Sequence, residues 1–146
     1  MRLTYKGDYS IKIILELAMY YGKGVMTIQE LAKKGDVPIK FLEQVLLDLK
    51  RGGFVESKRG KKGGYELAKR PDQIKLGDIV RYIDGPTEPI ACVSDRYKGC
   101  KEADRCVLRN IWQRVDGAIS GIIDNITFED LAQQSQRQRL ANDYNI

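Results

Sequence analysis

The residues best suited to chemistry in this chain are three cysteines, Cys92, Cys100 and Cys106. They lie within or beside residues 86–105, a stretch without helical or strand periodicity that leads into a helix. Gaps of seven and then five residues between the thiols suit convergence on one metal centre. An iron–sulfur cluster tolerates such wide spacing, whereas structural zinc normally uses tighter pairs. Three interpretations stay open here: a cluster, a zinc site, or thiols without a common role.

Histidine is absent from the chain, which removes every His-based nucleophile, general base and metal ligand. The sequence also lacks a Cys-x-x-Cys pair and a glycine-rich nucleotide-binding pattern. We therefore expect that the protein is not an enzyme, and a redox enzyme is the weakest interpretation. No apolar run approaches the roughly 20 residues that cross a bilayer, and the N-terminus has no long apolar stretch. A cytoplasmic location is expected.

Positive charge is concentrated in one half of the chain. The net charge is +5, but residues 1–70 hold 15 Lys and Arg against 8 Asp and Glu, whereas residues 71–146 hold 10 against 12. A basic half of this kind is typical of a surface that binds a polyanion such as nucleic acid. A basic surface is weak evidence by itself, so the elements that carry the charge have to be considered.

Three helices are predicted in the basic half. Asp8, as N-cap or first-turn acid, precedes a helix with an apolar stripe at Ile11, Ile14, Leu15, Ala18 and Met19. Thr27 and Glu30 form a capping-box pattern that opens a short helix ending at Gly35. A third helix buries Leu42, Val45, Leu46 and Leu49. The short glycine-containing turn between the last two helices is typical of a helix-turn-helix, with an ordinary helical hairpin as the alternative.

A cationic hairpin is predicted directly after the third helix. Residues 54–59 and 65–68 have strand character, and the glycine-rich residues 60–64 form the turn. Residues 50–62 contain six basic residues and one acid. Position and charge favour the wing of a winged helix, whose glycines let the backbone approach phosphates. The alternative is a solvated hairpin with charged edges that discourage aggregation.

The second half of the sequence predicts a dimerisation element. A helix at residues 76–83 is followed by the cysteine stretch and then by a long helix with a nearly continuous apolar stripe: Leu108, Ile111, Val115, Ala118, Ile119 and Ile122. In so small a domain the simplest partner for this stripe is a second copy of the chain. Thr127 caps a last short helix, and residues 133–146 are expected to fray.

Four segments together resemble the Rrf-two-type family of bacterial winged-helix regulators: residues 1–4 (Met-Arg-Leu-Thr), 41–44 (Phe-Leu-Glu-Gln), the wing at 59–65 and the three-cysteine loop. The resemblance covers residues 1 to about 132 and is strongest to the branch that regulates iron–sulfur cluster assembly genes. It implies a homodimer with a 2Fe-2S cluster on the three cysteines, and a Glu43 that discriminates between DNA sites according to cluster occupancy. With the basic wing, it gives the predicted DNA-binding residues: Thr27, Lys40, Phe41, Glu43, Gln44, Arg59, Gly60, Lys61 and Lys62.

The chain departs from that family pattern in two ways. The first cysteine gap is seven residues rather than the usual five, and Arg109 stands where the cluster-binding branch has a histidine as fourth ligand. Asp8 is a candidate replacement, because nitric-oxide-sensing relatives use an aspartate of the matching segment, supplied by the other subunit. Glu102 and Asp104 in the loop are further candidates.

The sequence therefore predicts a mostly helical winged helix-turn-helix protein with a small β-wing and a long dimerisation helix. Residues 1–70 form the DNA-binding region, 71–132 the cluster-loop and dimerisation region, and 133–146 a tail. The expected function is a dimeric regulator that binds a near-palindromic operator, senses iron–sulfur or redox status through a labile cluster and controls cluster biogenesis genes. The alternatives are a clusterless regulator of cysteine or sulfur metabolism that acts with a partner protein, and a nitric-oxide-sensing repressor.

Overall fold

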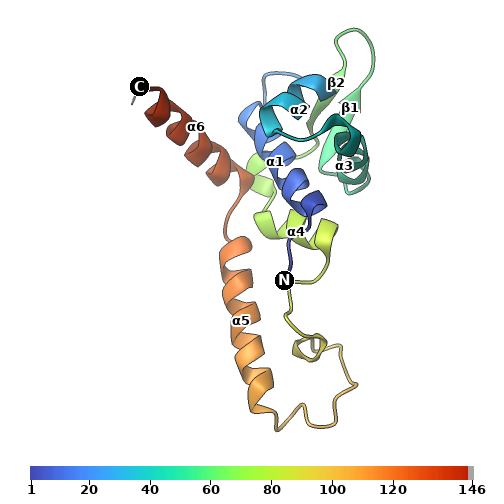
Figure 1. Ribbon diagram of the computed structural model, residues 1–146, viewed down its shortest axis with the longest axis vertical. Helices are drawn as coiled ribbons and strands as arrows, with labels where there is room; N and C mark the ends of the chain where they lie inside the picture. The colour runs from blue at the N-terminus through green and yellow to red at the C-terminus, as the bar shows by residue number, and fades with distance from the viewer. Residues whose placement is uncertain (145–146) are drawn as a thin grey trace.

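The computed structural model describes residues 1–144 as a helical head with a single-helix stalk. The elements follow in the order α1 (Tyr5–Met19), α2 (Ile28–Gly35), α3 (Ile39–Arg51), β1 (Val55–Lys58), β2 (Gly64–Leu67), η1 (Pro71–Gln73), α4 (Leu76–Asp84), η2 (Ala91–Val93), α5 (Val107–Ile123) and α6 (Phe128–Tyr144). The β1–β2 hairpin and the cysteine loop lie at opposite ends of the molecule, with α5 as the stalk between head and loop (Figure 1). The predicted fold class, mostly helical with a small wing, is confirmed.

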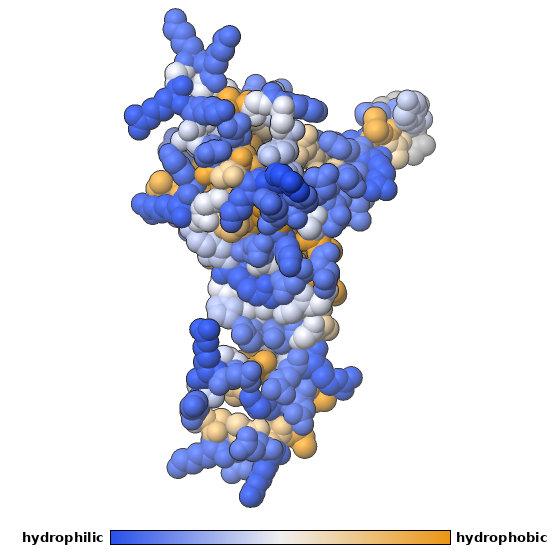
Figure 2. All heavy atoms as spheres, turned by 180° about the vertical axis from the view of Figure 1, so that it is seen from behind, coloured by the Kyte–Doolittle hydropathy of each residue, from blue (hydrophilic) through white to orange (hydrophobic). Residues whose placement is uncertain are grey.

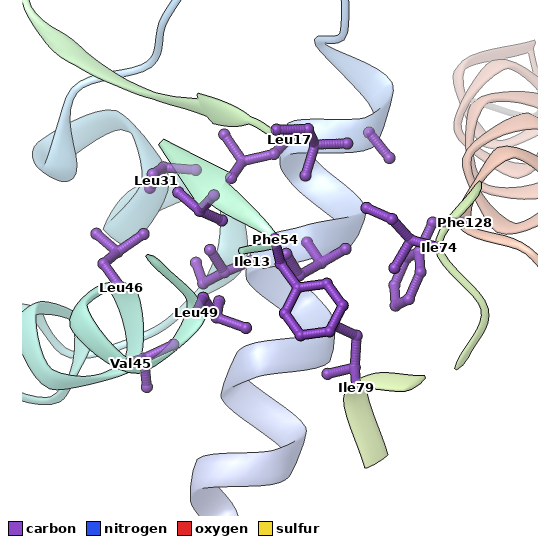
Figure 3. Close-up of a cluster of buried hydrophobic side chains, with 14 of the residues drawn as sticks. Ile13, Leu17, Leu31, Val45, Leu46, Leu49, Phe54, Ile74, Ile79 and Phe128 are labelled. Carbon is purple, nitrogen blue, oxygen red and sulfur yellow. The ribbon is translucent and has the colours of Figure 1, made fainter. Parts of the chain in front are cut away.

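Helix α1 lies at the centre of the head. Ile13 and Ile14 are fully buried and Leu17 nearly so, because α2, α3, α4 and α6 all pack against this helix. Figure 3 shows how side chains from several elements meet around α1. The predicted stripe contained Ile14 but missed Ile13 and Leu17, and its members Ile11 and Leu15 are only partly buried. A helix covered from several sides buries a wider arc than the single stripe of a surface helix.

Thr4 caps the N-terminus of α1, so the predicted capping role of Asp8 is wrong. The Thr4 hydroxyl accepts a hydrogen bond from the Gly7 N–H at 3.1 Å. Asp8 is the acidic residue of the first turn, and its carboxylate pairs with Lys12 at 2.8 Å. Asp8 therefore has the other of the two predicted roles, in which its charge favours the helix N-terminus.

The helix-turn-helix forms as the sequence predicts. The Thr27 side chain accepts from the Glu30 N–H at 3.2 Å, and the Glu30 carboxylate accepts from the Thr27 N–H at 3.0 Å, which completes the capping box of α2. Asp36 then turns the chain in a left-handed conformation (φ 51°) that few residues other than Gly, Asn and Asp adopt. Leu42 and Leu49 are fully buried, so the inner face of α3 is fixed against the head.

The wing is fastened at its base to the segment before α2. Strands β1 and β2 pair antiparallel from Val55 opposite Leu67 to Lys58 opposite Gly64. Tyr65 also exchanges two backbone hydrogen bonds with Met26, at 2.8 and 2.9 Å. A side chain at Gly64 would collide with the Met26 carbonyl, so this close approach requires glycine.

Helix α6 extends far beyond the short helix predicted after Thr127. The expected fraying is wrong for residues 133–144, which are helical, while residues 145 and 146 lie outside the described part. Arg139 supplies the reason: its guanidinium contacts the buried carboxylate of Glu16 on α1 at 2.6 Å, 123 residues away in the chain. A charged hydrogen bond to a distant helix is invisible to local sequence patterns.

Candidate DNA-binding surface and cysteine loop

The outer face of α3 carries the predicted base-reading side chains. Lys40, Phe41, Glu43 and Gln44 are all exposed, on the face opposite the buried leucines. Among residues 1–144, Lys40 and Glu43 form no ion pair. Packing of the inner face thus leaves the opposite face of α3 exposed in a fixed rotational setting of the helix.

Asp48 fixes the C-terminal half of α3 to two other helices. Its carboxylate pairs with Lys6 of α1 at 2.5 Å, and its backbone carbonyl accepts a hydrogen bond from the Tyr82 hydroxyl of α4 at 2.8 Å. The Lys6 ammonium, which outweighs the cost of partial burial, holds the pKa of Asp48 below its usual range. The Tyr82 ring stacks edge-on against Phe54 with ring centroids 5.4 Å apart. These contacts set the position of α3 relative to the rest of the head.

The wing holds a cluster of cations that have no acidic partner. Arg59, Lys61 and Lys62 are exposed around the turn, and Gly60 between them has a φ of 109°, which favours glycine. No acid of the described chain pairs with any of these three cations, whereas Lys58, the last residue of β1, is neutralised by Glu66 at 2.8 Å. In Figure 2 long hydrophilic side chains project from the wing end of the molecule.

A groove of about 670 Å³ separates the wing from the helix-turn-helix. Thr27, Glu43, Lys50 and Lys61 are among its lining residues. The Lys50 ammonium donates to the Ser57 hydroxyl at 2.7 Å, which links α3 to strand β1 across the groove. Of the predicted residues, the structure therefore brings Thr27, Glu43, Gly60 and Lys61 into one groove, whereas Phe41 and Gln44 line a second pocket. An α-helix flanked by free cations is the geometry that reads a major groove and binds phosphate.

An aromatic pocket of about 430 Å³, which the predicted elements did not indicate, lies on the other side of α3. Its walls include Tyr5, Tyr9 and Phe41. The Phe41 ring lies 6.0 Å from that of Tyr9 between centroids, and the Lys40 ammonium is 4.9 Å from the Phe41 ring. The i, i+4 spacing of Tyr5 and Tyr9 was the available signal.

The structure does not gather the three cysteines. Cys92 and Cys106 are partly buried, Cys100 is exposed, and none forms a disulfide. Within residues 1–144 no group of three His, Cys, Asp or Glu residues is placed to hold a metal ion. Asp8, Glu102 and Asp104 are thus not assembled with the thiols inside one chain. The donor set fits an iron–sulfur group in kind, since free thiols share one loop, but the loop would have to fold inward to bring them together.

Arg109 takes a structural role in this loop. Its Nε donates to the Cys92 carbonyl at 2.8 Å, and its guanidinium lies 3.8 Å from the Asp95 carboxylate. Thr87, which is buried, donates to Asp116 of α5 at 3.3 Å. The stretch before and after Cys92 is therefore fastened to α5, whereas Cys100 lies farther out in the loop.

Helix α5 exposes most of its apolar stripe. Val107 is 74% exposed, Leu108 and Ile122 are each 61% exposed, and only Ile123 of the helix is buried. Hydrophobic atoms are visible on the stalk in Figure 2. The C-terminal end of α5 is fixed to α4, because Arg81 of α4 pairs with Asp124 at 2.5 Å and also donates to Ser120. None of the helices within residues 1–144 is both long and apolar enough to span a bilayer.

Comparisons with known proteins agree on one family. The model of the Rrf2 family, described as iron-dependent transcriptional regulators, matches residues 3–134. The HTH-type transcriptional regulator CymR of Bacillus subtilis is 33% identical over 141 residues, covering 97% of this chain and 96% of CymR. The HTH-type transcriptional regulator IscR of Aliivibrio salmonicida is 28% identical over 146 residues, covering all of this chain and 86% of IscR. The solved structure of B. subtilis CymR, the global cysteine regulator, aligns with a TM-score of 0.77, covering 92% and 98% of the two chains.

Replacing Arg109 by alanine should loosen the loop around Cys92. The guanidinium donates to the Cys92 carbonyl, and loss of a charged hydrogen bond costs about 1.5–3 kcal/mol. We expect alkylation of the Cys92 thiol to accelerate about tenfold or more. Mass spectrometry of the modified peptide measures this rate. Cys100 is already exposed and serves as the internal control, so equal acceleration at both thiols would contradict a local role for Arg109.

Proposed function

Because the chain belongs to the Rrf2 family of transcriptional regulators, we propose that it is a cytoplasmic homodimer that binds a near-palindromic operator and responds to the state of its cysteine loop. DNA binding and transcriptional regulation are shared with the relatives, which are regulators and not enzymes. The observation that carries the proposal is the joint surface of α3 and wing, where free cations flank an exposed helix face.

Helix α3 is proposed to enter the major groove with Lys40 and Gln44 near base edges and Phe41 at the margin. Glu43 lies in the groove between helix and wing with no cation paired to it in residues 1–144. A carboxylate there accepts from cytosine N4 but repels phosphates and the acceptor edge of guanine. Glu43 therefore excludes sequences rather than adding general affinity, and it is the proposed discriminator between classes of operator.

The wing is proposed to lie on the DNA backbone, with Arg59 in a narrow minor groove. Lys61 and Lys62 neutralise phosphates, and the Gly60 backbone can approach closely because it has no side chain. Thr27, the N-cap of α2, lines the groove between helix and wing together with Glu43 and Lys61, and we propose that it contacts the DNA there.

We propose that a second copy of the chain covers the exposed apolar stripe of α5. Leu108, Ile111, Val115 and Ile122 are all exposed on this helix, and a contiguous exposed apolar patch is typical of a protein–protein interface. Pairing of two α5 helices about a two-fold axis would place the two heads on either side, so that both α3 helices meet successive turns of one DNA face. Half-sites are then separated by about 34 Å or a multiple of it.

Cys92, Cys100 and Cys106 are proposed to hold a 2Fe-2S cluster, with Asp8 of the partner subunit as the fourth ligand. Support comes from three free thiols on one loop and from the family's description as iron-dependent. When bound, the cluster supplies a one-electron redox centre that oxygen or nitric oxide can destroy. The chain's own residues position the loop: Arg109 holds the Cys92 backbone, and Cys106 precedes the first turn of α5.

A clusterless regulator remains the second candidate, on a specific observation. The thiols are not gathered, and the residue at the position of the missing histidine, Arg109, is engaged in holding the loop backbone. Similarity to CymR, the global cysteine regulator of B. subtilis, supports this candidate as well. In that case the loop would be a docking segment for a partner protein, and the cysteines would be incidental.

Replacing Arg59 by alanine should weaken operator binding by about 1–3 kcal/mol, because an Arg in a narrow minor groove makes a strong, desolvated contact. Fluorescence anisotropy on duplexes selected by the wild-type protein measures this loss. Arg70→Ala is the matched control, since Arg70 is an exposed cation outside the wing that is already paired with Asp72. Equal effects of the two changes would remove the wing from the DNA-binding surface.

Replacing Ile122 by aspartate should dissociate the dimer, because the buried carboxylates would face each other across the α5 pair without a partner. Sedimentation velocity should show a monomer that retains its circular dichroism. Asn110→Asp adds the same charge at an exposed polar position of α5 and should leave the dimer intact. An Ile122→Asp protein that still sediments as a dimer would place the interface elsewhere.

Anaerobically purified protein should contain two irons and two sulfides per chain on this proposal, with visible absorption that is lost in Cys92→Ala, Cys100→Ala or Cys106→Ala. Asp8→Ala should shift the visible spectrum if Asp8 is a ligand. Loss of the helix cap cannot account for such a shift, because the cap of α1 is Thr4 and is retained in this variant. Protein that binds its operator but holds no iron or sulfide would favour the clusterless candidate. Zinc in place of iron would also reject the cluster.

A further inference from the structure

The side-chain amide of Gln44 is held by a neighbour on its own helix. Gln44 Nε2 donates to Asp48 Oδ1 at 3.1 Å, one turn further along α3. The second carboxylate oxygen, Asp48 Oδ2, is buried, and the Lys6 ammonium lies 2.5 Å from it. The two oxygens of one carboxylate therefore have different partners, one on α3 and one on α1.

The charge of Asp48 determines which end of the Gln44 amide faces the carboxylate. Lys6 favours the ionised carboxylate, so the group has no proton to donate near neutral pH. Only the NH₂ end of Gln44 can therefore face it, and a flipped amide would set Oε1 against a negative oxygen. A Gln–Asp pair on an isolated helix contributes only a few tenths of a kcal/mol and is easily broken. Here Lys6 and the Tyr82 hydroxyl fix Asp48 from two other helices, so the acceptor is in place before any ligand binds.

A fixed amide reads bases differently from a free one. With Nε2 toward Asp48, Oε1 is directed away from it as an acceptor, and one Nε2 hydrogen stays unused. This pattern matches adenine, which donates from N6 and accepts at N7, and partly matches cytosine, which donates from N4. Guanine and thymine present acceptors, O6 and O4, at the corresponding edge.

We infer that Asp48, held by Lys6, is a positioning residue that fixes the amide direction of Gln44 and thereby makes this position of the operator selective for adenine over guanine. The inference rests on the proposed function, in which α3 reads the major groove. Asp48 itself touches no base, and it acts only through Gln44.

The test begins with duplexes selected by the wild-type protein from a randomised 30-bp pool. The base pair whose preference disappears in Gln44→Ala is the one that Gln44 reads, and four duplexes differing only at that pair are then compared by anisotropy at one salt concentration. The wild type should bind the adenine duplex at least about fivefold more tightly than the guanine duplex, the lower end for a good bidentate contact. In Asp48→Leu, which keeps the bulk but has no acceptor, the ratio should fall to within about twofold.

Two further variants separate positioning from a structural effect. Asp48→Asn, whose amide can accept or donate, should give an intermediate ratio, and it provides the measurement if the leucine variant does not fold. Asp72→Asn removes a carboxylate from an exposed ion pair outside α3 and should keep the wild-type ratio. In a Gln44→Ala background, Asp48→Leu should change the ratio no further, because the amide it positions is gone.

Several results would overturn the inference. A wild-type ratio in both Asp48 variants, or an equal loss of affinity on all four duplexes, would leave Asp48 with a structural role only. A preference for guanine in the wild type would contradict the assigned amide direction. Unchanged preferences in Gln44→Ala would reject Gln44 as a base reader while DNA binding stands. If the wild type enriches no sequence from the pool, the proposed function itself fails.

Discussion

The burial of α1 among four other helices is the constraint on which the rest of the structure depends. Ile13 and Ile14 are inaccessible to water, and every element that carries a functional side chain packs directly or indirectly on this helix. Burial of side chains of this size contributes about 1.5–3 kcal/mol each, which outweighs single surface contacts. Helix α3 can present one face outward only because its leucines are fixed inward against α1. The proposed DNA-binding surface is therefore the outer face of a helix whose inner face belongs to the hydrophobic core.

The parts of the fold with a local signature could be predicted from the sequence. The capping box of Thr27 and Glu30, the apolar face of α3 and the glycine-rich turn of the wing each depend on residues within a few positions of one another. The exposed α5 stripe was also predictable, because its apolar residues repeat with helical spacing. Hydrogen bonds and packing within one turn or one hairpin are encoded locally, and such patterns carry over from sequence to structure.

Contacts between distant segments could not be predicted in the same way. The Arg139–Glu16 pair turns a polar C-terminal segment into a docked helix, and the Lys6–Asp48 pair connects the first turn of α1 to α3. Each joins residues whose types are common on any surface, and only the fold brings them together. For the cysteines, the spacing predicts a contact that the structure does not show within residues 1–144. Their loop is irregular, so it has no repeating geometry that would bring the thiols together without a bound group. The sequence shows that Arg109 stands where the histidine ligand is missing, but no local pattern predicts its hydrogen bond to the loop backbone.

The attachment of α5 at one end makes this helix a lever. Arg81, Asp124 and Ser120 fix its C-terminal end to the head, whereas its N-terminal end continues into the cysteine loop. At 1.5 Å per residue, a 17-residue helix is about 25 Å long, so a rotation of about 10° about the fixed end moves the far end by about 4–5 Å. Conversely, a movement of several ångströms in the cysteine loop would rotate α5 by only a few degrees at its fixed end in the head. A large displacement of the loop would thus become a small rotation of the head. In the proposed dimer, a rotation of that size would finely adjust the spacing between the two α3 helices along the DNA.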